Sequence, residues 1–337
     1  MQPDIFVQIP AYRDPQTLPT IQSALTLAKY PQRISIGVCW QYMPGEDEHM
    51  LPRTALPANV RLLSVPALES KGCSWARHKV QSLFQGEQYT LSIDSHTRFT
   101  PDWDVGLIDE LKRCGSPKAV ISNYPPGFSE SEAPDQHAPL HYMAADEFID
   151  EGLPRFRSIE RHDQHERPLR GLFIAGGFHF SHGSMIKDMP ADPHLYFNQE
   201  EVLLAARCWT HGYDIYSPSK NFLFHLYTPP SKAAGRRRLH WDDHEKWGKW
   251  DSVAHKRAQH ILKLKLSQDR KVLLDIEKYA LGQQRELSDF VALSGIDFKS
   301  KKVSTRAHNA EFVKELNPWL WANDNHGGQA VILREKK

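Results

Sequence analysis

The sequence predicts an α/β protein in which a mainly parallel, Rossmann-like sheet is flanked by helices and followed by a helical C-terminal extension. In the first hundred residues, short apolar runs alternate with amphipathic segments, and parallel strands require such helical crossovers. The 337 residues suffice for one large domain with an appendage, and 40% hydrophobic with 25% charged residues is typical of a globular chain.

Strands are expected where apolar residues form short continuous runs closed by turn residues. These runs cover residues 5–9, 34–40, 60–65, 89–93, 119–122, 173–180, 214–217 and 221–225. Helices are expected where apolar residues recur at three- and four-residue spacing. These segments cover residues 18–27, 74–84, 103–112, 200–211, much of 252–279, and 285–293. Gly212 follows the fourth helix as its expected C-cap.

Two regions depart from this alternation. Residues 124–170 are rich in Pro, His and charge, which predicts long loops over the sheet edge with a short helix near 144–149. After Tyr227 the sequence becomes mostly helical, so we place a domain boundary near residue 230. Residues 1–230 would form the α/β domain. Residues 231–337 would complete the functional site and offer a surface for a homo-oligomer.

Composition and charge argue against several classes of protein. The formal net charge of +1 disfavours a nucleic-acid-binding protein. The four cysteines are scattered, which predicts reduced thiols and a cytoplasmic protein. The N-terminal residues lack the pattern of a signal peptide, and no stretch approaches the roughly 18 apolar residues that a transmembrane helix needs.

The sequence IDSHTRF at 93–99 is the central chemical feature. Asp94 and His96 are two residues apart just after an apolar strand, so an extended backbone lets both face one ligand. A carboxylate and an imidazole suit Mn²⁺, with Mg²⁺ as the alternative. His225, at the end of another apolar run, could complete the ligand set. An ordinary polar turn at 94–96 and a buried structural histidine at 225 are the competing interpretations.

Four other features are expected at the same edge of the sheet, where ligands of parallel sheets bind. The glycine pair at 176–177 favours close approach of a ligand to the backbone, or else a bend in the sheet. Glu200 and Glu201 begin a helix, where acids also compensate the helix dipole, and one of them would face an acceptor. Tyr227 could stack on a base. The three arginines at 236–238 would form a solvated face or cover phosphates.

Taken in order, these motifs resemble one enzyme family. The chain is similar to the retaining family 60 of glycosyltransferases, the cytosolic UDP-GlcNAc:polypeptide N-acetylglucosaminyltransferases and their bacterial relatives. The resemblance covers most of residues 4–298 and rests on the combination rather than on any one motif. The motifs are IPAYRD, GxxxARH, SIDSHTRF, AGGFHFSHG, FNQEEVLLAARCWTHGYDIYSP, FHLY and LGQQRELSDFVALSGIDF.

The resemblance implies a GT-A fold, a divalent cation that is often Mn²⁺, a UDP-sugar donor and transfer with retention of configuration. It implies that the metal ligands are Asp94, His96 and His225, and that Glu200 or Glu201 lies at the acceptor end as the catalytic carboxylate. The donor would bind at Pro10, Ala11, Tyr12 and Arg13 for the uridine, at Arg77, Asp94, Ser95 and Tyr227 for the nucleotide or diphosphate, and at Gly176 and Gly177 for the sugar.

The resulting hypothesis is a metal-dependent retaining transferase that moves a sugar, N-acetylglucosamine by resemblance, from UDP to a hydroxyl on a protein or glycan. A divalent-metal hydrolase is one alternative, but the sequence has no HExxH and no second D-x-H for a two-metal site. A non-catalytic sugar-nucleotide-binding protein on the same scaffold is the other. The intact D-x-H and the later histidine argue against it.

Overall fold

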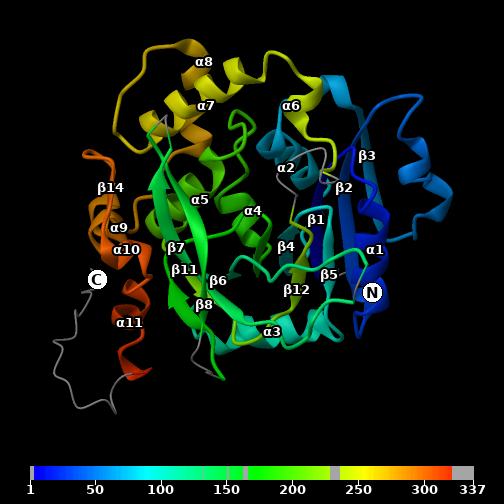
Figure 1. Cartoon of the computed structure of the whole chain (residues 1–337), viewed down its shortest axis with the longest axis horizontal. Coiled ribbons are helices and arrows are strands. Elements are labelled where there is room, and N and C mark those ends of the chain that lie inside the picture. The colour runs from blue at the N-terminus through cyan, green and yellow to red at the C-terminus, as the bar shows by residue number, and fades with distance from the viewer. Residues whose placement is uncertain (1–3, 132, 150–151, 162–165, 228–235, 321–337) are drawn as a thin grey trace.

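The computed structural model describes residues 4–131, 133–149, 152–161, 166–227 and 236–320. Its centre is an eight-stranded sheet in the order β3–β2–β1–β4–β10–β6–β11–β9 (Figure 1). Strand β10 runs antiparallel to β4 and β6, β9 runs antiparallel to β11, and the other neighbours are parallel. The strands are β1 (Ile5–Tyr12), β2 (Ile34–Tyr42), β3 (Val60–Pro66), β4 (Tyr89–Ile93), β6 (Ala119–Ser122), β9 (Leu169–Gly171), β10 (Phe178–His182) and β11 (Asp214–Ser217).

Strand β1 is buried on both faces, which explains its continuous apolar run. Ile5, Val7 and Ile9 pack on one face with residues of α1 (Thr17–Thr26) and α3 (Trp103–Arg113). Phe6 packs on the other face with Ala76 of α2 (Cys73–Gln81). Successive strand residues point to opposite faces, so helices on both sides require apolar residues at nearly every position.

A second core joins the sheet to the C-terminal helices. It gathers buried residues of α5 (Gln199–Thr210), α7 (Trp247–Ile261), α9 (Leu287–Ser294) and α11 (Phe312–Leu316). Figure 1 shows these helices, in green, yellow, orange and red, on the side away from the N-terminal strands. The expected helical region 252–279 is divided into α7, α8 (Arg270–Leu273) and a 3₁₀ turn at 276–279. The predicted boundary near residue 230 lies outside the described residues.

The prediction of loops over 124–170 with a helix near 144–149 is wrong. Strands β7 (Leu140–Phe148) and β8 (Pro154–Arg161) form an antiparallel hairpin there. Three consecutive residues of β7, 143–145, are buried, and Phe156 of β8 stacks on Phe173 at 4.3 Å between ring centroids. Because the hairpin packs against α5 and the C-terminal elements, its burial does not follow the alternation of a half-exposed strand.

The remaining elements are short. A two-stranded sheet pairs β5 (Thr97–Phe99) with β12 (Leu223–His225), and β13 (Ile296–Asp297) pairs with β14 (Lys302–Val303). The short helices are α4 (Ser184–Asp188), α6 (His240–Asp243) and α10 (Thr305–His308). No helix in the described part of the chain has both the length and the apolarity of a membrane span.

The C-terminal helices are attached to the core by a buried ion pair, whose loss should destabilise the fold. Arg257 of α7 is fully buried, and its Nε donates to Asp192 Oδ2 at 2.6 Å. We expect Arg257→Met to lower the free energy of unfolding by about 3–5 kcal/mol, because it leaves a buried carboxylate uncompensated. Urea unfolding measures this. Arg270→Met, at an exposed position of α8, should change the free energy of unfolding by less than about 0.5 kcal/mol. Equal effects of the two variants would contradict a structural role for the pair.

Candidate metal centre and nucleotide-binding cleft

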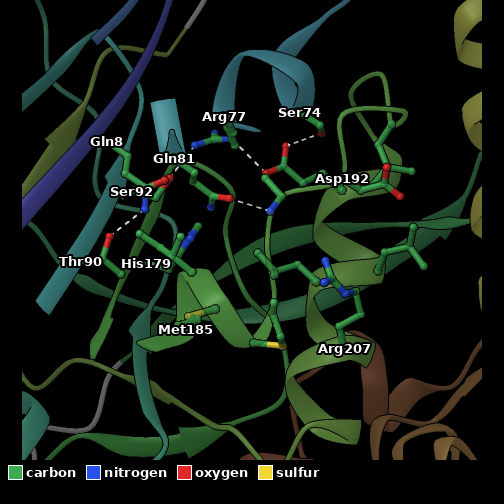
Figure 2. A pocket seen from close by; sticks show the side chains of 17 residues that line it. Gln8, Ser74, Arg77, Gln81, Thr90, Ser92, His179, Met185, Asp192 and Arg207 are labelled. Atoms are coloured by element: carbon green, nitrogen blue, oxygen red, sulfur yellow. Dashed lines mark hydrogen bonds and ion pairs between the residues drawn. The ribbon is translucent and has the colours of Figure 1, made fainter. Parts of the chain in front are cut away.

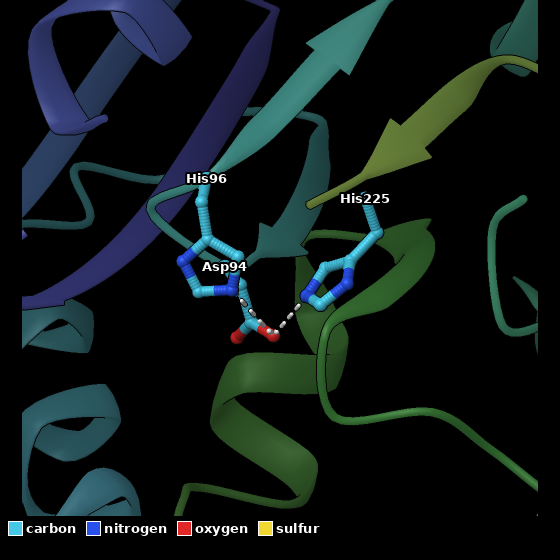
Figure 3. Close-up of side chains that lie close together, drawn as sticks. All are labelled: Asp94, His96 and His225. Carbon is cyan, nitrogen blue, oxygen red and sulfur yellow. Dashed lines mark hydrogen bonds and ion pairs between the residues drawn. The ribbon is translucent and has the colours of Figure 1, made fainter. Parts of the chain in front are cut away.

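Two pairs of strands bring three potential metal ligands together. Asp94 directly follows β4, and His96 directly precedes β5. Strand β12 pairs antiparallel with β5 so that His225 lies opposite Thr97. This pairing carries an imidazole from 129 positions further along the chain (225 minus 96) to the loop after β4. Figure 3 shows the rings of His96 and His225 on either side of the Asp94 carboxylate.

The three side chains are close enough to share one ion. His225 Nε2 lies 3.1 Å from Asp94 Oδ2, and His96 Nε2 lies 4.0 Å from the same oxygen. One ligand atom from each residue falls within 4.8 Å of the others, and in the described residues this is the one such cluster of His, Cys, Asp or Glu. The structure therefore brings together the three residues that the sequence analysis grouped as metal ligands.

A second carboxylate, which the sequence analysis did not single out, orients His96. Asp14 Oδ2 accepts a hydrogen bond from His96 Nδ1 at 2.7 Å and one from Ser95 Oγ at 2.7 Å. A carboxylate of this kind only accepts, so Nδ1 carries the proton and Nε2 presents a lone pair to the cluster. Metal-binding histidines commonly have such a carboxylate behind them. Asp14 ends the motif IPAYRD, and that position was its only signal in the sequence.

The ionisation states fit a cation site. Burial alone would raise the pKa of Asp94, but His225, Arg77 and His96 together hold it well below its usual range. Burial lowers the pKa of His225 and outweighs the hydrogen bond to Asp94. A carboxylate and neutral imidazoles are the forms that bind metals. His225 Nδ1 is buried and has no hydrogen-bond partner among the residues described. The donor set therefore fits a divalent ion of borderline softness.

Arg77 lies behind Asp94 and fixes it. Its Nη2 is 3.0 Å from Asp94 Oδ1, its Nη1 donates to Ser92 Oγ at 2.7 Å, and its Nε forms a 2.9 Å ion pair with Glu200. The side chain also borders a small cavity of about 40 Å³ with polar and apolar walls, and Figure 2 shows it there beside Ser92 and Ser74. Arg77 thus binds one oxygen of Asp94 and leaves the other facing the two imidazoles.

The glycine pair gives the Asp94 carboxylate its space. A Cβ atom at position 177 would lie 2.6 Å from Asp94 Oδ2, closer than any side chain tolerates. At position 176 it would lie 3.4 Å from Arg77 Nη2. Gly177 is therefore required by the approach of the backbone to the metal centre rather than by a special backbone angle.

The cluster of Asp94, His96 and His225 lies where two cavities meet. One, of about 290 Å³, is bounded by the glycine pair, Tyr124, the start of α5 and residues 154–156 of the hairpin. The other, of about 440 Å³, is bounded by the end of β1, Tyr196 and residues 237–241. Both cavities are lined by Cys73, Asp94, Phe197, His225 and Tyr227. A ligand with two parts can therefore occupy both cavities with its junction at the cluster.

Comparison with known proteins identifies the family of the chain. A family model described as Glycosyltransferase (GlcNAc) matches residues 4–56 and 45–300. The chain belongs to this glycosyltransferase family. No curated protein matches it.

Two solved structures are similar to the fold. The crystal structure of GalNAc-T7 with UDP, GalNAc and Mn²⁺ has a TM-score of 0.56 at 13% identity, covering 90% of this chain and 58% of that one. A mannosyltransferase from Pyrobaculum calidifontis, in complex with GDP-Man and Mn²⁺, has a TM-score of 0.43 at 13% identity, covering 83% and 70%. The chain thus spans little more than half of the GalNAc-T7 structure. The glycosyltransferase has the GT-A fold predicted from its sequence.

The expected uridine-binding segment of this glycosyltransferase divides into residues on the cleft and residues within the fold. Pro10 and Tyr12 line the larger cavity, whereas Ala11 is fully buried in β1. The Arg13 guanidinium forms ion pairs with Asp47 at 2.8 Å, with Asp243 at 3.1 Å and with Glu46. It therefore ties the end of β1 to α6 instead of presenting free donors to a ligand.

At the other end of the cleft, the surroundings of Glu201 favour the protonated, neutral form of its carboxyl group. Its Oε1 accepts from Gly176 N at 2.8 Å, and its Oε2 accepts from the Tyr124 hydroxyl. Burial raises the pKa of Glu201 to about 7 despite these hydrogen bonds. Tyr227, which is 49% exposed, donates to Pro125 O at 2.8 Å and contacts His225 with 4.4 Å between ring centroids.

The raised pKa of Glu201 should make stability depend on pH. For an acid whose folded-state pKa is raised from 4.5 to about 7, the contribution to stability is full below pH 4.5 and is lost as the pH rises through 7. Glu201→Gln stays neutral, so we expect its melting temperature to exceed that of the wild type by about 2–4 °C at pH 8 and to match it at pH 5. Thermal unfolding at both pH values measures this, with exposed Glu69→Gln as the control. The same difference in melting temperature at both pH values would contradict the raised pKa of Glu201.

Proposed function

We propose that this glycosyltransferase is metal-dependent and retaining, and that it moves a sugar from a UDP-sugar to a hydroxyl acceptor on a protein or glycan. The observation that carries the proposal is the cluster of Asp94, His96 and His225 at the junction of two cavities. A nucleotide diphosphate-sugar has its charged group at such a junction, between the nucleoside and the sugar. N-acetylglucosamine is the sugar favoured by the resemblance and by the description of the family model.

A divalent cation bound by this cluster would neutralise the charge that develops on the leaving diphosphate. One oxygen and two nitrogen ligands favour Mn²⁺ over Mg²⁺. The similar GalNAc-T7 structure contains Mn²⁺ with UDP and GalNAc, which supports the same choice of cation and nucleotide. Arg77 would keep the Asp94 carboxylate oriented toward the cation, and Asp14 would do the same for the His96 ring.

The larger cavity suits the nucleoside, and the smaller one suits the sugar and the acceptor. Tyr12, His240 and Trp241 give the larger cavity aromatic walls. The last two belong to the C-terminal region, so we propose that residues after 230 complete the cleft. Gly176 and Gly177 let a sugar lie against the backbone of the smaller cavity, and Glu200 and Glu201 mark its acceptor end.

The environment of the two glutamates favours a same-face mechanism for retention. Glu200 is paired with Arg77, and Glu201 is occupied by Tyr124 and the Gly176 amide. Neither presents a free carboxylate as a nucleophile. The leaving phosphate itself would then accept the proton of the acceptor hydroxyl while the protein positions the two substrates. A two-metal hydrolase would need a second ligand cluster, whereas the described residues contain a single such cluster.

Loss of a ligand should abolish metal-dependent turnover and leave the fold intact. We expect Asp94→Ala or His96→Ala to reduce the hydrolysis of a UDP-sugar in Mn²⁺ by at least about 10²-fold, because charge on the leaving group is no longer stabilised. Released UDP measures turnover, and circular dichroism measures folding. His137→Ala, on an exposed loop, serves as the control. Full activity of either ligand variant, or activity of the wild type in excess chelator, would contradict the metal role.

The nucleotide preference can be tested separately from the metal. A panel of UDP- and GDP-sugars with Mn²⁺, assayed by nucleotide release, should show the fastest hydrolysis with UDP-GlcNAc. The resemblance predicts this preference. The aromatic walls of the larger cavity alone would not distinguish UDP from GDP. A GDP-sugar preference would overturn the nucleotide assignment while leaving the metal centre unaffected.

A further inference from the structure

One arginine of the run 236–238 enters the metal centre, while its two neighbours are bound elsewhere. Arg236 Nη2 donates to Asp242 Oδ1 at 2.8 Å, and Arg238 Nε donates to Asp243 Oδ1 at 2.9 Å. Arg237 instead lies with its Nη2 3.0 Å from His96 Nε2, and it lines the larger cavity. The sequence analysis treated these three residues as one solvated face or phosphate cover. Their partners show that they differ.

The contact of Arg237 conflicts with metal binding. His96 Nδ1 donates its proton to Asp14, so Nε2 has one lone pair, and the Arg237 N–H takes it. A cation bound to His96 requires the same lone pair. The guanidinium is always charged and would also repel a divalent ion a few ångströms away. Arg237 and the cation therefore cannot share His96 Nε2.

We propose that Arg237 occupies His96 Nε2 in the metal-free enzyme, is displaced when the cation binds, and then pairs with the diphosphate of the donor. The inference rests on the proposed function, because it takes His96 as a metal ligand. Arg237 already lines the cavity assigned to the nucleotide, and a planar guanidinium suits phosphate oxygens.

The surrounding contacts limit the exchange to one side chain. Arg236 and Arg238 are held on either side by the aspartates of α6, and Leu239 N donates to Asp242 Oδ2 at 2.8 Å. Asp243 is itself held by Tyr12 and Arg13 at the end of β1. The backbone at position 237 is thus anchored to the sheet. Rotation of the Arg237 side chain suffices for the change of partner.

The proposal couples the two ligands of the cleft. Without nucleotide, the cation must displace a hydrogen-bonded guanidinium, which weakens cation binding. With the diphosphate present, the displaced guanidinium gains an ionic partner, and this strengthens cation binding. Arg237 would therefore raise the cooperativity between cation and nucleotide beyond the direct bonds between them.

The experiment is a titration of Mn²⁺, with the free ion measured by electron paramagnetic resonance, in the presence and absence of UDP. We expect Arg237→Gln to bind Mn²⁺ about tenfold more tightly than the wild type without UDP, the effect of losing one charge-assisted hydrogen bond. With saturating UDP the difference should disappear, because the diphosphate has then already taken Arg237 away from His96. Arg270→Gln, at an exposed position of α8 that lines neither cavity, should follow the wild type in both conditions.

Each outcome decides a separate step. Equal Mn²⁺ affinity of the wild type and Arg237→Gln without UDP would overturn the competition for His96. Tighter binding by Arg237→Gln in both conditions would overturn the transfer to the diphosphate. Saturable Mn²⁺ binding that Asp94→Ala does not remove would contradict the proposed function instead. Absence of Mn²⁺ binding in every variant would overturn both. Thermal unfolding of each variant verifies that it is folded.

Discussion

The ion pair between Arg77 and Asp94 is the contact on which the rest of the site depends. A carboxylate that is only 27% exposed benefits from a compensating charge, and Arg77 supplies one that cannot be titrated away. Because the guanidinium binds Oδ1, Oδ2 is left to the imidazoles and to a cation. The same oxygen excludes any side chain at position 177, and the ion pair to Glu200 sets the start of α5. Four segments of the chain are thus placed by one charged pair.

The topology explains why residues so far apart in the sequence meet. Strand β4 ends at the carboxyl edge of the parallel sheet, where side chains of successive strands converge. The antiparallel insertion of β10 beside β4 brings the glycine pair, which precedes it, to that edge. The small β5–β12 sheet then crosses the edge and delivers His225. The second core holds α5 and the hairpin on the far side, so the walls of the smaller cavity belong to packed elements.

The sequence predicted best the elements whose environment leaves a local pattern. Strands 89–93 and 119–122 were located at their observed ends, because burial on both faces of the sheet makes an apolar run continuous. The end of α5 was located by Gly212, which has φ +79° just beyond the helix. The hairpin β7–β8 was not predicted, because its residues pack against α5 and C-terminal elements that are distant in the sequence.

The site likewise has features that leave a local pattern in the sequence and features that do not. Asp94 follows a strand, His96 precedes one and His225 ends one, so their meeting could be anticipated from the order of the elements. The partners that set their chemistry could not, since they are single side-chain contacts across long separations. Asp14 lies 82 positions from His96, and Asp243 lies 230 from Arg13. A local pattern carries no information about such pairs, and Arg13 illustrates the consequence: its motif suggested a ligand contact, whereas three carboxylates take up its charge.

The distribution of charge around the cleft suggests how one scaffold can both hold a highly charged donor and release its product. Arg77 is a permanent charge on the protein side of Asp94, whereas the proposed cation would be a removable charge on the other side. Without a ligand, Arg237 lies 3.8 Å from Asp14, and Arg77 is shared by Asp94 and Glu200, so three carboxylates face two arginines. In the proposed function, this centre would repel a diphosphate until a cation adds positive charge. Binding of the donor would then depend on the cation, and loss of the cation would lower the affinity for the nucleotide product by the same coupling.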